Sequence, residues 1–80
     1  MKLPRDLSAD ALVRRLARYG YSVTRQTGSH LRLTTNQGGE HHATIPAHGS
    51  LRIGTLNSIL SDVAAHLKKS KEQLMQEMFG

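Results

Sequence analysis

The sequence contains no cysteine and no tryptophan, and only three of its 80 residues are Tyr or Phe. Without cysteine the chain can form no disulfide, no thiolate metal site and no cysteine nucleophile. Three aromatic side chains supply little surface for base stacking, which many single-strand nucleic-acid binders use. No apolar run is long enough to span a membrane, and residues 1–7 lack the apolar segment of a signal peptide. We therefore expect a cytoplasmic protein that does not interact with membranes.

The length predicts one domain over residues 1–80, with a lead-in over residues 1–7 and a short C-terminal helix within residues 68–80. The net charge of +5 is uneven. Residues 1–55 carry seven Arg and one Lys against three acidic residues, whereas residues 56–80 carry three Lys against three acidic residues. A basic surface rich in Arg indicates a polyanionic partner such as nucleic acid, although small soluble domains are also often basic for solubility.

The first half of the chain predicts one helix followed by three strands. Ser8 is a suitable N-cap for a helix that runs to about Arg18, and Gly20 is suited to end it. Alternating residues predict strands over 21–26, 30–35 and 41–45, separated by short turns. Strands joined by short connections form an antiparallel meander.

The second half predicts two helices. Thr55 can cap a helix to about Leu67, whose apolar residues recur at helical spacing. Ser70 with Gln73 has the pattern of a capping box for a last helix over 71–79. The expected fold is α+β, with a three-stranded antiparallel sheet and the helices on one face. The other face should be polar and basic, with Ser22, Thr24, His30, Arg32, His42 and Thr44.

The turns also predict the strand register. If Thr35 lies opposite His41, then His30 lies opposite Pro46. If residues 27–29 form the first turn, Gln26 lies opposite His30.

This register gathers four candidate residues at one end of the sheet: Arg25, Ser29, His30 and His48. Arg25 is expected on the core face with Tyr21 and Val23, so it would have to reach around the end of the sheet.

His30 is the candidate for chemistry. A neutral imidazole can take a proton from a ribose 2′-hydroxyl near neutral pH. Arg25 or Arg32 could then stabilise the charge on the phosphate, and the amides of Gly28 and Ser29 could form a small anion-binding nest. The alternative interpretation is a surface histidine in a turn of a basic protein.

The other polar groups have weaker patterns. Among the five histidines, His41 and His42 project to opposite faces of a strand and Glu40 is the only nearby carboxylate, so we expect no metal site. Arg14, Arg15 and Arg18 should lie on the solvent side of the first helix, either as a solvated face or as phosphate contacts. The last helix could cover the core or serve as a partner surface.

Several short motifs occur in a recognisable order. They are Arg25–His30 (RQTGSH), Thr44–His48 (TIPAH) and Gly54–Leu60 (GTLNSIL), preceded by the helix that ends at Gly20 and Tyr21. In this order and spacing the sequence resembles the HicA (YcfA-like) toxin family over about residues 7–67. The resemblance implies the fold of double-stranded-RNA-binding domains, α-β-β-β-α, to which this chain adds residues at both ends.

The resemblance also implies a function. Members of the family are small ribonucleases, or mRNA interferases, that cleave mRNA without a metal or other cofactor, and a HicB antitoxin covers their site. The histidine of the Gly-Ser-His motif, here His30, is then the catalytic residue. We expect Arg25, Gly28, Ser29, Arg32 and His48 to contact RNA. A non-catalytic RNA-binding module and a domain that binds only the antitoxin are the alternatives, and the oligomeric state stays open.

Overall fold

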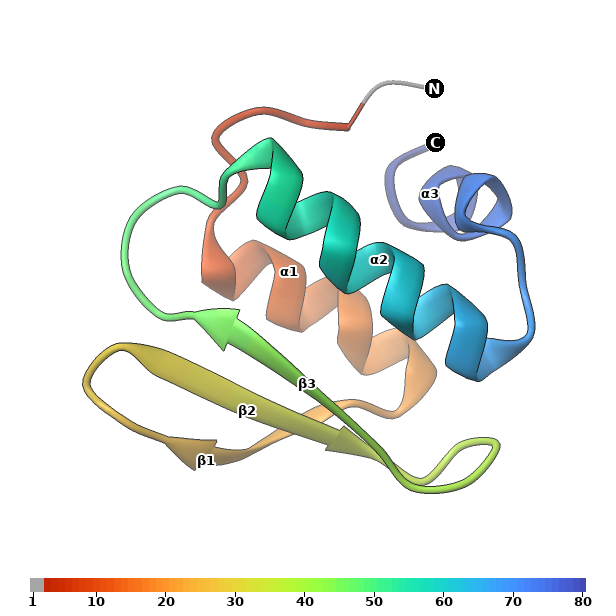
Figure 1. The fold of residues 1–80 in the computed structure, drawn as a ribbon, viewed down its shortest axis with the longest axis horizontal. Coiled ribbons are helices and arrows are strands. Elements are labelled where there is room, and N and C mark those ends of the chain that lie inside the picture. The colour runs from red at the N-terminus through yellow and green to blue at the C-terminus, as the bar shows by residue number, and fades with distance from the viewer. Residues whose placement is uncertain (1–2) are drawn as a thin grey trace.

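The computed structural model describes residues 3–80 and has the predicted α+β architecture (Figure 1). The elements in chain order are α1 (Ala9–Leu16), the 3-10 turn η1 (Ala17–Tyr19), β1 (Ser22–Gln26), β2 (His30–Thr35), β3 (His41–Pro46), α2 (Ile53–Leu67) and α3 (Lys71–Phe79). The three strands form one antiparallel sheet in the order β1-β2-β3. Helices α1 and α2 lie side by side on one face of this sheet, and the other face is open (Figure 1).

The first helix begins where the sequence predicts. The Ser8 hydroxyl accepts a hydrogen bond from the Ala11 N–H at 3.1 Å, which satisfies one of the free donors of the first turn. The last turn tightens into η1, and Gly20 then takes a left-handed conformation with φ of +83°. A Cβ at Gly20 would lie 2.8 Å from the Thr35 hydroxyl, so both the backbone angle and the space require glycine. The strand after it begins at Ser22 rather than at the buried Tyr21.

The second helix begins earlier than predicted. It starts at Ile53, and Thr55, the expected cap, lies within its first turn. The loop before it is tied to the start of α1, because the Leu51 N–H donates to the Leu7 carbonyl at 2.8 Å. Leu51 is buried, and α2 begins two residues after it, at Ile53. The predicted apolar stripe of α2 is buried and consists of Leu56, Ile59, Leu60, Val63 and Ala64.

The core lies between the sheet and these two helices. Strands β2 and β3 supply Leu31, Leu33, Ala43 and Ile45 to it, and α1 supplies Leu12 and Leu16. The register between β2 and β3 is the predicted one, with His30 opposite Pro46 and Thr35 opposite His41. Since direct cross-strand partners share a face, this register sends His30 and Arg32 to the open face.

The register between β1 and β2 differs from the prediction. Val23 lies opposite Leu33, but Arg25 lies opposite Arg32 and Gln26 opposite Leu31, because a β-bulge falls between Val23 and Arg25. The extra residue reverses the alternation of side chains. Arg25 therefore lies on the open face with Arg32, and the expectation that it starts from the core face is wrong.

The same strand contributes little to the core. Every residue of β1 is exposed, and Val23 keeps 41% of its surface in contact with solvent. It is an edge strand of the sheet, and the packing of the helices leaves all of its residues exposed.

Helix α3 packs against the outer side of the helical layer, away from the open face (Figure 1). The predicted cap is present, since the Ser70 hydroxyl accepts from the Gln73 N–H at 3.0 Å. Leu74, Met75 and Met78 are buried. The last helix therefore extends the core.

Two of the three α1–η1 arginines hold α3 in place. Arg15 Nε donates to the Met78 carbonyl at 3.1 Å, and Arg18 Nη1 donates to the Glu77 carbonyl at 2.7 Å. The carbonyls at the end of a helix lack intrahelical partners and attract cations. Arg15 is half-buried, so its expected place on a solvent-facing surface is wrong.

The carboxylate of Glu77 joins the same contact. It accepts from Lys69 Nζ at 2.7 Å and from the Tyr19 hydroxyl at 2.8 Å. These hydrogen bonds hold the pKa of Glu77 below its usual value. Burial, together with the Glu77 carboxylate, raises the pKa of Tyr19 to about 12.

Candidate functional site

The turn between β1 and β2 is organised by one hydroxyl group. Thr27 Oγ1 accepts from the backbone N–H of Ser29 at 3.4 Å and of His30 at 3.0 Å. The Thr27 N–H in turn donates to the His30 carbonyl at 2.9 Å. Local bonds of this kind are typical of Ser and Thr in turns. They fix the backbone at His30.

The predicted anion-binding nest is not formed. The Ser29 N–H points to the Thr27 hydroxyl, and Gly28 does not have the positive φ that such a nest requires. A Cβ at Gly28 would meet no atom within 4 Å. Neither the space nor the backbone angle at this position therefore demands glycine.

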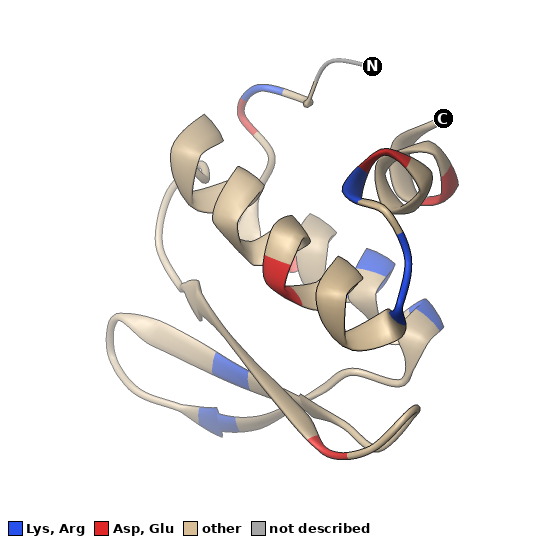
Figure 2. Cartoon of the chain, turned by 45° about the vertical axis from the view of Figure 1, so that its right-hand side comes forward, with Lys and Arg blue, Asp and Glu red and all other residues tan. Residues whose placement is uncertain are grey.

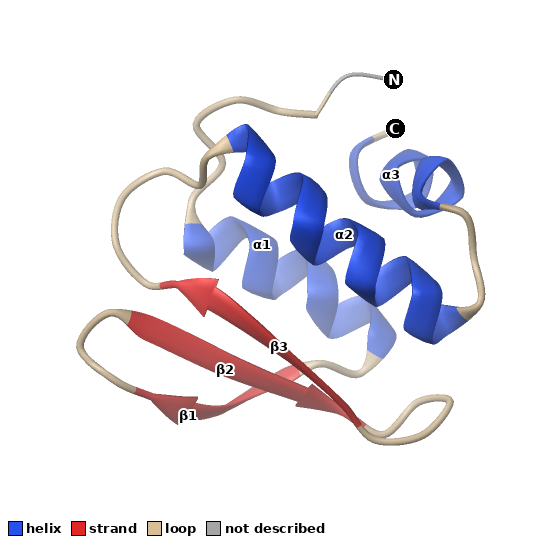
Figure 3. Ribbon diagram, viewed as in Figure 1, coloured by secondary structure: helices blue, strands red, loops and turns tan. Residues whose placement is uncertain are grey.

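The chain after β3 clamps the same turn. The Ala47 N–H donates to the Ser29 carbonyl at 2.8 Å, and His48 Nε2 donates to the Gly28 carbonyl. The turn and the loop after β3 lie at the same end of the sheet (Figure 3). Three of the candidate positions, Gly28, Ser29 and His48, are thus brought to His30 as expected.

The imidazole of His30 is exposed at this end of the open face. Its Nδ1 lies 2.9 Å from Ser29 Oγ. In the tautomer with the proton on Nδ1, this N–H donates a hydrogen bond to Ser29 Oγ. The lone pair on Nε2 is then available to act as a base. Within residues 3–80, His30 Nε2 has no hydrogen-bond partner.

Arg25 and Arg32 lie directly opposite each other on the same face. Both are exposed, and within residues 3–80 neither guanidinium makes a salt bridge. Figure 2 shows the basic residues of the sheet on the neighbouring strands β1 and β2. Like charges placed opposite each other destabilise a strand pair. An anion bound between them would remove this cost.

The far end of the open face holds a hydrogen-bonded network of hydroxyl groups and His42 that ends at Glu40. The Thr24 and Thr34 hydroxyls lie 2.8 Å apart, and Thr34 Oγ1 lies 2.8 Å from His42 Nδ1. His42 Nε2 contacts Glu40 at 3.0 Å. His42 pairs with Thr34, as the register predicts. These contacts occupy both ring nitrogens of His42, in contrast to His30.

The comparison with models of protein families identifies the family of this chain. The model of the HicA toxin family, described as the HicA toxin of bacterial toxin-antitoxin, matches residues 9–68. The chain belongs to the HicA toxin family. It is a toxin of a toxin–antitoxin system, and an antitoxin is its implied partner. The searches of curated proteins and of solved structures gave no match.

The matched segment of this HicA-family toxin includes the whole sheet and the His30 turn and ends before α3. No helix within residues 3–80 has the length and apolar character needed to cross a membrane. The described part of the chain also has no group of three or more His, Asp or Glu residues that could hold a metal ion.

The remaining histidines of this HicA-family toxin lie on the helical side of the sheet. His41 Nδ1 accepts from the Tyr21 hydroxyl at 2.7 Å, and His41 Nε2 lies 3.3 Å from Asp62. The His66 ring stacks on His41 at 4.4 Å and donates to the Gln37 carbonyl at 2.9 Å. Burial raises the pKa of Tyr21 to about 12. This cluster joins α2 to the sheet and the β2–β3 loop, and it is separate from the open face.

Sequence reasoning missed Thr27. The sequence does indicate this role, because a threonine at the start of a tight turn can accept hydrogen bonds from the backbone N–H groups two and three residues after it. Thr27 precedes Gly28, Ser29 and His30 directly. The position of His30 thus depends on the hydroxyl of Thr27, a side chain that neither carries charge nor titrates.

Proposed function

We propose that this HicA-family toxin is a ribonuclease that cleaves mRNA without a metal ion and uses His30 as its catalytic residue. One observation carries the proposal. An exposed imidazole with an available Nε2 shares the open face with two opposed arginines that have no counterion within residues 3–80. Arg32 is two residues along β2 from His30, which is roughly 7 Å at the rise of a strand. A phosphate on the arginines therefore lies within reach of the imidazole.

The chemistry follows from this placement. Nε2 of His30 takes the proton of a ribose 2′-hydroxyl, and the freed oxygen attacks the adjacent phosphorus. The guanidinium groups of Arg25 and Arg32 stabilise the additional charge that develops on the phosphate oxygens. The 5′-oxygen then leaves and takes up a proton from water, so that the upstream fragment ends in a 2′,3′-cyclic phosphate. No step in this sequence requires a metal ion.

The other candidate residues have supporting roles. Ser29 Oγ orients the imidazole through Nδ1, and Gly28 supplies the carbonyl to which His48 is bound. With Nε2 so engaged, His48 presents Nδ1 to RNA. Gly28 has no side chain to obstruct a strand that passes over the turn.

The partners follow from the same surface. The open face is polar, basic and uncovered by the helices, so a HicB-like antitoxin that lies on it would hide His30 and both arginines (Figure 2). Since mRNA is the substrate, the activity belongs in the cytoplasm.

The test is to incubate the purified protein with RNA in the presence of EDTA. The proposal predicts fragments with 2′,3′-cyclic phosphate ends, and it predicts that replacement of ribose by deoxyribose at the cut position prevents cleavage. Salt-dependent binding without fragments would instead support a non-catalytic RNA-binding module. Cleavage that stops in EDTA would contradict the metal-free mechanism.

A further inference from the structure

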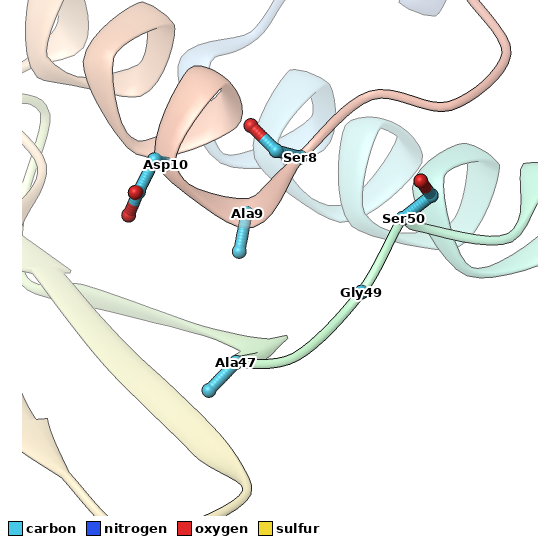
Figure 4. Close-up of a pocket in the computed structure, with 6 residues that line it drawn as sticks. All are labelled: Ser8, Ala9, Asp10, Ala47, Gly49 and Ser50. Carbon is cyan, nitrogen blue, oxygen red and sulfur yellow. The ribbon is translucent and has the colours of Figure 1, made fainter.

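A cavity of about 380 Å³ lies between the start of α1 and the loop after β3. It is lined by Ser8, Ala9, Asp10, Ala47, Gly49 and Ser50. In Figure 4 the Ala9 side chain points from the start of α1 toward Ala47, the Asp10 carboxylate lies on the left beside Ala9, and Gly49 and Ser50 follow along the loop on the right. The hollow is open to solvent on one side, and its volume is within the range of small-molecule sites.

The cavity shares a wall with the His30 turn. Ala47 lines the cavity, while its backbone N–H donates to the Ser29 carbonyl at 2.8 Å. The next residue, His48, is bound to Gly28 on the same turn. A strand whose scissile phosphate lies at His30 therefore has a flanking nucleotide next to this cavity.

The lining determines which part of a nucleotide fits. Asp10 is the only charged residue of the lining, and it makes no salt bridge within residues 3–80. The Ser8 hydroxyl is occupied by the N–H of Ala11. A carboxylate accepts hydrogen bonds and repels phosphate, and the methyl groups of Ala9 and Ala47 offer apolar walls. The cavity therefore suits a neutral base that presents N–H donors, and the phosphates remain with the arginines.

Among the RNA bases, guanine matches a carboxylate best. Its ring N1–H and its exocyclic amine are adjacent donors that can reach both carboxylate oxygens, whereas uracil has a single N–H between two carbonyl groups. We infer that the cavity beside Asp10 binds a guanine base that flanks the cleaved phosphate. This inference rests on the proposed ribonuclease function for its biological meaning, but binding of the base can be measured without cleavage.

The first experiment measures binding by NMR titration of the full chain with guanosine 3′-monophosphate and uridine 3′-monophosphate. We expect the guanosine nucleotide to shift the amides of Ala9, Asp10 and Gly49, with an affinity about tenfold above that of the uridine nucleotide. Asp10→Asn should abolish this difference. Glu72→Gln is the matched control, because it also removes an acidic residue from the first turn of a helix, α3, and it should keep the difference.

The second experiment maps the cuts in an RNA of random sequence. We expect the wild-type cuts to cluster beside guanine and the Asp10→Asn cuts to spread over the four bases. If the wild type cleaves nothing but guanosine nucleotide still binds in the cavity through Asp10, the proposed function fails and this inference stands. If the wild type cleaves RNA but the nucleotides bind equally, or the Asp10→Asn cuts match those of the wild type, the inference is overturned and the proposed function stands.

Discussion

Arg25 lies directly opposite Arg32 across the β1–β2 pair, and both side chains are on the open face of the sheet. This juxtaposition exists only because the bulge after Val23 shifts Arg25 by one position. A strand pair that places two cations side by side gives up stability unless an anion binds there. We propose that an RNA phosphate binds between these two arginines, at the end of the sheet where His30 also lies.

Substitution of either Arg25 or Arg32 should raise the stability of the fold and weaken RNA binding. Arg32→Gln removes the repulsion and should raise the free energy of unfolding by up to about 1 kcal/mol. It should weaken RNA binding and reduce the slope of log K against log salt by about one. Arg14→Gln, on the exposed side of α1, is the control and should have a smaller effect on binding. An Arg32→Gln protein that is less stable and binds RNA as well as the wild type would contradict the phosphate site.

Thr27 should act as a positioning residue for His30. Thr27→Val removes the acceptor for two amides but keeps the shape of the side chain, so kcat should fall by about 10- to 100-fold while KM changes little. Thr27→Ser keeps the hydroxyl and should restore most of kcat. The ¹⁵N–¹H shifts of Ser29 and His30 should move in the valine variant only. Equal kcat values in the two variants would show that the hydroxyl does not position the histidine.

Glu77 should stabilise the packing of α3 in a pH-dependent manner. Its pKa is lowered in the folded chain, so its contribution is present at neutral pH and is lost as the pH falls through the folded value. Glu77→Gln should therefore lower the Tm at pH 7, and the difference from the wild type should vanish in acid. RNA cleavage should be unaffected, because α3 packs away from the open face (Figure 1). Glu72→Gln should melt close to the wild type; a loss equal to that of Glu77→Gln would remove the special role of Glu77.

The two tyrosines should titrate together at high pH. Burial raises the pKa of both Tyr19 and Tyr21 to about 12 in the folded protein, against an ordinary value of 10. The stability that they contribute is complete below pH 10 and is lost as the pH rises toward 12. Phenolate absorbance should therefore increase near pH 12 and coincide with alkaline unfolding seen by circular dichroism. An increase centred near pH 10 in the folded protein would contradict the burial of these side chains.

The architecture was predictable because the local signals are strong. The apolar spacing of α2, the caps at Ser8 and Ser70 and the short β2–β3 loop determine the elements and one strand register. The bulge in β1 was not predictable, since the segment Ser22–Gln26 contains no glycine to indicate it and lies on an exposed edge strand where burial does not set the register.

The roles of the basic residues depended on contacts far apart in the chain. Arg15 and Arg18 resemble a solvated helix face in the sequence, yet their partners are the carbonyls of Met78 and Glu77, about sixty residues away. Removing them from the candidate site leaves Arg25 and Arg32 as the opposed pair beside His30. We therefore propose that the arginines that bind RNA are those of the sheet, Arg25 and Arg32.

The central claim is that His30 performs the chemistry, and the most direct measurement is single-turnover cleavage of RNA in EDTA by the wild type and by His30→Ala. Loss of a general base should lower the rate by about 10²- to 10⁴-fold. The variant should keep its circular dichroism spectrum and bind RNA nearly as tightly, because the imidazole is exposed and the arginines remain. A folded His30→Ala protein that cleaves RNA at the wild-type rate would contradict the account.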